Sequence, residues 1–225
     1  MKTMGLTQLS LVKPPTAFPN AESTARAAGA DDILVNAQIS DSLDGALADC
    51  GIIIGTSARQ RRLDITLLSP HECGKLAVTG AAHNKVAIVF GREHAGLTNT
   101  ELNRCHYHVN IPSNSEFSSL NLAAAVQILA YEIHLNSLIA PTTQPAPSHD
   151  AFANAHEVQL FYQRLQQTLA TIGFLKQNSP RKLMPRLRRL FNRTHLEKME
   201  LDLLMGILKK INTSIRDEEV SNENP

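Results

Sequence analysis

The sequence predicts an α/β fold, in which a parallel sheet carries helices on both faces and a small α-helical domain follows. Short apolar runs alternate with helical patterns from residue 6 to residue 131, the order that builds parallel sheets. Three of these runs end in polar or glycine-containing loops, where open α/β sheets bind ligands. A proline-rich stretch then separates this region from two further helical patterns.

Composition limits the class of protein. With 225 residues, 43% of them hydrophobic, the chain can bury one large core and a small second one. No apolar run has the length of a membrane span and the first ten residues lack a signal-peptide pattern, so we expect a soluble cytoplasmic protein. Cys50, Cys73 and Cys105 are widely spaced, which predicts buried thiols rather than disulfides or a zinc site.

The first quarter of the chain is predicted to contain three strands separated by helices. Asn20 is a candidate cap for the first helix, which Gly29 closes, and Asp41 is a candidate cap for the second. The expected strands are 6–12, 33–39 and 52–54, and the expected helices are 21–28 and 41–48.

A second group of elements follows the third strand. Ser69 and Glu72 form a capping-box pattern with proline at the first helical position, and Thr98 and Glu101 form another. Between these helices, the apolar run 86–90 predicts a buried strand that stops at Gly91. The loop 91–96 has the glycine spacing of a P-loop but lacks the Lys-Ser/Thr pair that follows, which argues against a nucleoside triphosphate.

Residues 107–111 predict another strand, and the polar loop 112–118 leads from it to a helix that extends to Tyr131. Ser118 and Ser119 stand at the expected start of this helix, where a serine caps the backbone. We therefore expect 1–137 to form the α/β domain and 138–155 to be a linker. Helices follow over 156–212, and the acidic residues 213–225 are expected to be disordered.

Residues 173–193 are strongly basic. They hold seven of the chain's 22 Lys and Arg residues and no Asp or Glu, which favours phosphate binding over a merely solvated face. Phe174 and Phe191 lie in the same segment, where packing is favoured over stacking on bases. The basic residues are Lys176, Arg181, Lys182, Arg186, Arg188, Arg189 and Arg193.

Three stretches resemble a known family. FGREHAGLTNTEL at 90–102, the strand 107–111 and IPSNSEFSSLNLAAAVQILAYE at 111–132 closely resemble the second and third motifs of the SPOUT methyltransferases, and within them the TrmJ family of tRNA 2'-O-methyltransferases. Ser115 and Phe117 stand where that family more often has Pro and Tyr. The resemblance implies a deep C-terminal trefoil knot in the α/β domain, S-adenosylmethionine as cofactor and a homodimer. It further implies tRNA as partner and methylation of nucleotide 32 in the anticodon loop.

The same resemblance implies the site residues. Ser119 would stand beside the ribose hydroxyl, Arg59 and Arg61 would hold the target phosphate, and Glu93 would make a structural hydrogen bond. The RNA-binding residues of the helical domain would be Arg181, Lys182, Arg186, Arg188, Arg189 and Arg193. His94, His106 and His108 do not form a recognisable metal set, so we expect no metal. The cofactor would be held by Thr56, Ser57, Ala58, Gly91, Ile111, Ser118, Ser119 and Leu120.

The family's first strand and its loop, N-x-G-x-x-A-R-A with the catalytic arginine, normally precede the segment MKTMGLT, which is residues 1–7 here. We expect this strand and arginine to lie upstream of Met1. Without them, the sheet would have a gap flanked by unpaired backbone. Two alternatives stay open: a non-catalytic remnant that binds tRNA and cofactor, and a SPOUT enzyme with another RNA target.

Overall fold

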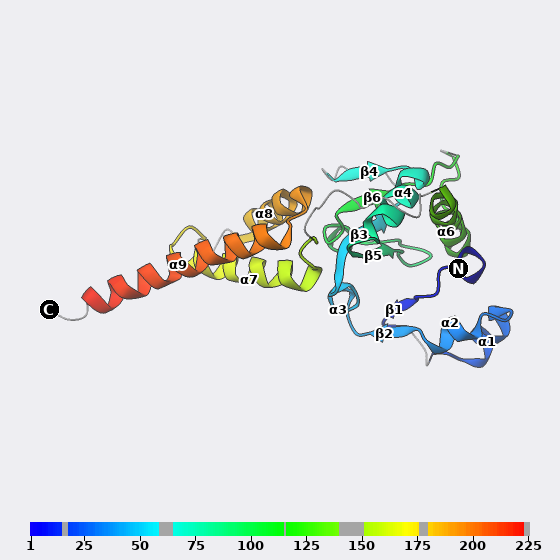
Figure 1. The fold of residues 1–225 in the computed structure, drawn as a ribbon, viewed down its shortest axis with the longest axis horizontal. Helices are drawn as coiled ribbons and strands as arrows, with labels where there is room; N and C mark the ends of the chain where they lie inside the picture. Colours follow the sequence, from blue (N-terminus) through cyan, green and yellow to red (C-terminus); the bar gives the residue numbers. More distant parts are fainter. Residues whose placement is uncertain (15–17, 59–64, 115, 140–150, 176–179, 223–225) are drawn as a thin grey trace.

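The computed structural model of the chain describes residues 1–225 except 15–17, 59–64, 115, 140–150, 176–179 and 223–225. The chain forms an α/β body, which we call the sheet body, and a unit of three helices that extends away from it (Figure 1). The C-terminus lies at the far end of the last helix.

A four-stranded parallel sheet forms the centre of the sheet body. Its strands are β3 (Cys50–Thr56), β4 (Thr66–Leu68), β5 (Lys85–Val89) and β6 (Tyr107–Val109), in the order β4-β6-β3-β5. The middle of β3 is almost fully buried, because this strand has a neighbour on each side and helices over both faces. The parallel α/β class predicted from the sequence is confirmed.

A second, two-stranded parallel sheet pairs β1 (Ser10–Val12) with β2 (Gln38–Ser40). It lies beside the main sheet but is not hydrogen-bonded to it in the part of the chain that the structure describes (Figure 1). The predicted strands therefore do not all join one sheet. The short helices of this region are η1 (Lys2–Met4), α1 (Ala21–Ala27), α2 (Asp31–Val35) and α3 (Leu43–Leu47).

Helices α4 (Pro70–Gly80) and α6 (Leu122–Ile139) pack against each other. A Cβ atom at Gly74 would lie 2.6 Å from the carbonyl oxygen of Glu132, so the glycine permits this close approach. Among the described residues, α6 is the one helix long and apolar enough to cross a membrane, a test that core helices also pass. The remaining helix of the sheet body is α5 (Asn99–Leu102).

The C-terminal unit consists of α7 (Ala155–Thr171), α8 (Pro180–Thr194) and α9 (Lys198–Asn222). Phe161, Tyr162, Met184, Leu201 and Leu208 are among the residues that form its buried core. This unit has a core of its own, separate from the two clusters that surround the sheet. We call it the helical unit.

Several predicted elements differ from the structure. The predicted strand 33–39 is confirmed only at residues 38–39, which lie in β2, because residues 31–35 form α2, whose Asp32 accepts a hydrogen bond of 2.8 Å from Lys2. Ser42 rather than Asp41 caps α3. Strand β4 was not predicted, and α9 continues to Asn222 through most of the segment expected to be disordered.

Candidate active site

Three loops leave the same edge of the main sheet. Because β6, β3 and β5 are adjacent and parallel, their carboxyl ends meet at one edge, as the sequence predicted for the ligand site. The first loop follows Thr56, the second begins after Val89, and the third runs from Asn110 to Asn121. We call this the carboxyl edge.

The first loop is tied to the third. Ser57 donates its backbone N–H to the carbonyl oxygen of Val109 at 3.1 Å, and its own carbonyl accepts the side-chain amide of Asn110 at 2.8 Å. Thr56 ends β3 partly buried, while Ala58 is exposed. Arg59 and Arg61, expected to hold a phosphate, lie outside the described residues.

The second loop crosses its own backbone at Gly91. A Cβ atom there would lie 2.1 Å from the carbonyl carbon of Gly96, and Gly96 has a φ of +65°. Gly96 donates its N–H to the carbonyl of Arg92 at 2.8 Å, which closes the loop. The two glycines are thus needed for the turn of this loop. The backbone of the loop lies at the carboxyl edge.

Glu101 holds this loop to α5. It accepts the backbone N–H of Thr98 at 2.7 Å and pairs with the Arg92 guanidinium at 3.1 Å. Partial burial alone would raise the pKa of Glu101, but the hydrogen bonds from Thr98 and Arg92 lower it overall. Glu93, expected to make a structural hydrogen bond, is exposed and makes none to the described residues, whereas Glu101 makes the hydrogen bonds that hold this loop.

The third loop presents several side chains at the edge. Ser113 donates its hydroxyl to the carbonyl of Ser118 at 3.1 Å, and Ser119 and Leu120 are exposed. Helix α6 begins at Leu122, and the side-chain oxygen of Asn121 accepts the N–H of Ala123 at 2.9 Å. The expectation that Ser118 or Ser119 caps this helix is therefore wrong, and the Ser119 hydroxyl faces solvent at the carboxyl edge.

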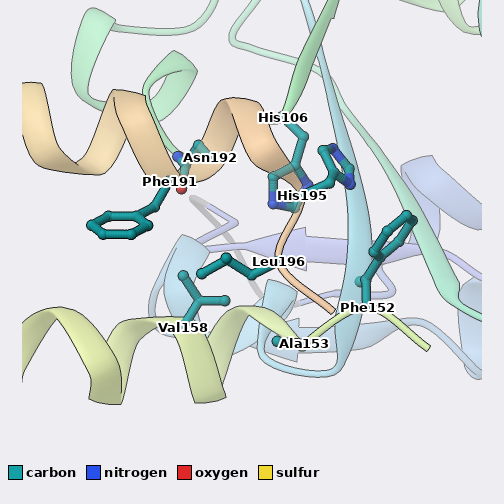
Figure 2. A pocket seen from close by; sticks show the side chains of 9 residues that line it. His106, Phe152, Ala153, Val158, Phe191, Asn192, His195 and Leu196 are labelled. Atoms are coloured by element: carbon teal, nitrogen blue, oxygen red, sulfur yellow. The ribbon is translucent and has the colours of Figure 1, made fainter. Parts of the chain in front are cut away.

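The histidines are used structurally. His106 accepts the backbone N–H of Ile53 on Nδ1 at 3.1 Å, and His108 Nε2 lies 3.3 Å from the carbonyl of Leu102. His106 also stacks on His195 from the turn between α8 and α9, with ring centroids 4.2 Å apart (Figure 2). Within the described ranges, no group of three or more His, Cys, Asp or Glu residues has the geometry of a metal site.

The sheet body and helical unit meet on the other side of the sheet, at a contact we call the junction. Gly51 and His106 lie at the amino ends of β3 and β6, opposite the carboxyl edge, and Asn192 of α8 donates to the carbonyl of Asn103 at 3.1 Å. The largest cavity here has a volume of about 530 Å³. A smaller one, seen in Figure 2, is lined by Phe152 and His195.

The basic residues of α8 are divided between solvent and the junction. Arg186 is exposed, Arg188 lines the largest cavity, and Arg189 and Arg193 line a third cavity beside it. The side chains of Arg181 and Lys182 lie outside the described residues. Phe191 packs on Phe161 with ring centroids 5.0 Å apart, as the packing interpretation predicted, whereas Phe174 is 65% exposed, so that interpretation is wrong for Phe174. The junction was not predicted, because Asn103 and Asn192 are 89 residues apart in sequence.

Comparisons with known proteins cover almost the whole chain. The SpoU rRNA Methylase family matches residues 1–131, and the family described as tRNA methyltransferase TrmJ, C-terminal domain, matches residues 156–220. The tRNA (cytidine/uridine-2'-O-)-methyltransferase TrmJ of Salmonella typhimurium is 49% identical over 94% of this chain and 87% of that protein. The protein of the same name from Klebsiella pneumoniae is 50% identical over the same shares.

Solved structures agree with these sequence matches. The crystal structure of TrmJ from Z. mobilis ZM4 has a TM-score of 0.82 with 28% identity, covering 94% of this chain and 90% of that one. A probable methylase family protein from Haemophilus influenzae Rd KW20 is 42% identical with a TM-score of 0.57, covering 96% and 88%.

Proposed function

Because the chain belongs to the TrmJ family of tRNA 2'-O-methyltransferases, we propose that it methylates the ribose of the cytidine or uridine at position 32 in the tRNA anticodon loop. The observation that carries the proposal is that three loops meet at the carboxyl edge. These loops lie within the residues that match the methylase family. S-adenosylmethionine would supply the electrophilic methyl group.

The residues of the carboxyl edge fit this cofactor. Residues 56–58 and Gly91 lie on the first and second loops at this edge, and Ile111 and Leu120 offer apolar cover for an adenine ring. Leu120 is 38% exposed, which leaves an apolar side chain at the edge for such a ligand. The contacts of Ser57 with Val109 and Asn110 hold the first and third loops together at this edge.

Methyl transfer to a ribose requires an oriented hydroxyl and removal of its proton. The exposed Ser119 hydroxyl is the proposed positioning group, since it lies on the third loop beyond Ser118. Arg59 and Arg61 are proposed to bind the phosphate of the target nucleotide. In family members, an arginine on a strand and loop that precede the segment matching residues 1–7 assists deprotonation.

A homodimer and a cytoplasmic location are part of the same proposal. Of the 18 residues of α6, only Leu129, Ala130 and Asn136 are buried, although most of the helix is apolar. Tyr131 and Leu138 are 48% and 69% exposed. A second copy of the chain would cover this surface, and the segment 96–102 is a further candidate for the interface.

The decisive experiment is methyl transfer from labelled S-adenosylmethionine to unmodified tRNA. The chain of residues 1–225 is compared with a version extended at its N-terminus by the family's strand and N-x-G-x-x-A-R-A loop, and the modified nucleotide is mapped. We expect the extended version to methylate nucleotide 32, at a rate at least about 100-fold above the unextended one, the usual contribution of a catalytic acid or base.

Each other outcome contradicts a part of the proposal. Equal activity of both versions would contradict the role of the upstream arginine. Activity at another nucleotide would favour a different RNA target. Binding of tRNA and cofactor without activity in either version would favour the non-catalytic alternative.

A further inference from the structure

The largest cavity of the junction is built by both parts of the molecule. Helices α3 and α5 and the turn after α5 form one wall, and α7 and α8 form the other. Its volume of about 530 Å³ lies within the range of small-ligand sites. Thr100, His156 and Pro185 on its lining are exposed, so the cavity opens to solvent.

Arg188 places a positive charge in this cavity and, among the described residues, has no carboxylate at ion-pair distance, although Asp44 is near enough to interact with it electrostatically. Its guanidinium lies 4.3 Å from the ring centroid of Tyr162 and donates to the neutral side chain of Gln159 at 2.9 Å. Burial lowers the pKa of Arg188 and the charge of nearby Arg104 lowers it further, while Tyr162 and Asp44 offset part of this decrease. A half-buried cation of this kind is stabilised by an anion.

The acid in the same cavity is already used. Asp44 accepts hydrogen bonds from Nε and Nη2 of Arg104, so its charge is matched by that guanidinium. Two arginines therefore face one carboxylate in this cavity, which leaves its lining with a net positive charge.

We propose that this cavity is a second RNA site, which takes a phosphodiester-linked ribonucleotide of the tRNA with its phosphate on Arg188. The phosphate of a ribonucleotide supplies the anion that this net positive lining lacks. This inference rests on the proposed function, because it takes tRNA to be the ligand.

The position of the cavity gives this site a role different from that of the carboxyl edge. It lies at the amino ends of β3 and β6, so a nucleotide bound there is not the one being methylated. Because both units form the walls, the bound nucleotide holds the helical unit against the sheet body. The site thus couples recognition of the tRNA to the placement of the helical unit.

The test compares two arginines of one helix. Arg188→Gln removes the cavity charge, and Arg186→Gln removes an equal charge from the exposed surface of α8. Dissociation constants for tRNA are measured with the full chain over a range of KCl concentrations. We expect Arg188→Gln to weaken binding by about tenfold and to reduce the salt slope by about one, the loss of one charged contact. Arg186→Gln is expected to weaken binding by less than about threefold.

A second variant separates loss of the cavity charge from misfolding of Arg188→Gln. Gln159→Glu places a carboxylate at the hydrogen bond to Arg188 and neutralises the cavity while every arginine stays in place. It is expected to reproduce the tenfold loss. Photocrosslinking with 4-thiouridine-substituted tRNA is expected to label peptides from α7 or α5 in the wild-type chain and not in Gln159→Glu.

Four results are informative. Equal losses in Arg188→Gln and Arg186→Gln, or crosslinks confined to other surfaces, would overturn the second site while leaving the proposed function intact. Titration with cytidine 5'-monophosphate forms a separate arm. Arg188-dependent binding of that free nucleotide, with tRNA affinity unchanged in Arg188→Gln, would also overturn the RNA assignment. Absence of any tRNA binding by the wild-type chain would instead refute the proposed function.

Discussion

Gly91 shows how a single residue shapes the carboxyl edge. Its hydrogen atom is all that fits where the second loop crosses itself, since an added Cβ would meet the backbone of Gly96 and Leu97 at 2.1–2.3 Å. Gly206, in the middle of α9, has no atom within 4 Å of the same added carbon. A side chain is therefore excluded at Gly91 and has room at Gly206.

These glycines give a paired prediction. Gly91→Ala is expected to lower the free energy of unfolding by about 1–3 kcal/mol, the usual cost of forcing an atom into a packed site, and to weaken cofactor binding. Gly206→Ala is expected to raise it by about 0.5–1 kcal/mol, because alanine favours a helix interior. Urea denaturation measures both, and a stable Gly91→Ala variant would contradict the described crossing of the loop.

His106 and His195 also act at the scale of single residues. Burial first, and then the charge of His195, lower the pKa of His106 to about 3, and burial lowers that of His195 to about 4. Tyr107 and Phe152 are the other rings that pack on His195. Both imidazoles are therefore neutral at the junction well below the pH at which they protonate in an unfolded chain.

The consequence for stability has a definite sign. As the pH falls below about 6.5, the unfolded chain binds protons that the folded protein does not, so the free energy of unfolding decreases until the pH reaches about 3. His195→Asn is expected to reduce this slope by about 1 kcal/mol per pH unit between pH 6 and 5. Phe152→Leu, which changes the same cluster without removing a titrating group, is expected to lower stability while keeping the slope. Urea melts at each pH provide the measurement.

At the scale of elements, the sequence predicted those helix starts that depend only on residues close together in the chain. Capping boxes at Ser69 and Thr98 and the cap at Asn20 are all present, because a cap depends on residues three positions apart. The strands 52–54, 86–90 and 107–111 are confirmed with bounds shifted by one or two residues, as expected for apolar runs with a glycine or a polar loop at the end.

Elements that depend on distant contacts could not be predicted. Ile33, Leu34 and Val35 have strand composition, yet they lie in α2, where Lys2 pairs with Asp32 from 30 residues away. In α8 the sequence predicted a basic segment but not which of its arginines face solvent and which face the junction. Arg188 lies over the ring of Tyr162 because α7 and α8 pack together. At the carboxyl edge the loops were predictable, whereas the choice of Glu101 over Glu93 depends on the fold of the second loop.

At the scale of the whole molecule, α6 gives a prediction about assembly. Leu138→Glu places a charge on the exposed apolar side of this helix and is expected to weaken the proposed dimer by about 100-fold, the loss of one buried leucine side chain. Leu203→Glu, at a comparably exposed leucine on α9, is the control and is expected to remain dimeric. Sedimentation velocity over a range of concentrations separates these cases. A dimer that survives Leu138→Glu would place the interface elsewhere.

The three cysteines have a practical consequence. Cys50, Cys73 and Cys105 are all buried, and burial raises the pKa of Cys73 and Cys105 to about 12. Maleimides react with exposed thiolates, so the native thiols are expected to stay unlabelled at neutral pH. A pair of cysteines introduced at exposed positions, one on α9 and one on α4, would then accept fluorescent dyes selectively. Energy transfer between the dyes would report the distance between the two units before and after tRNA is added.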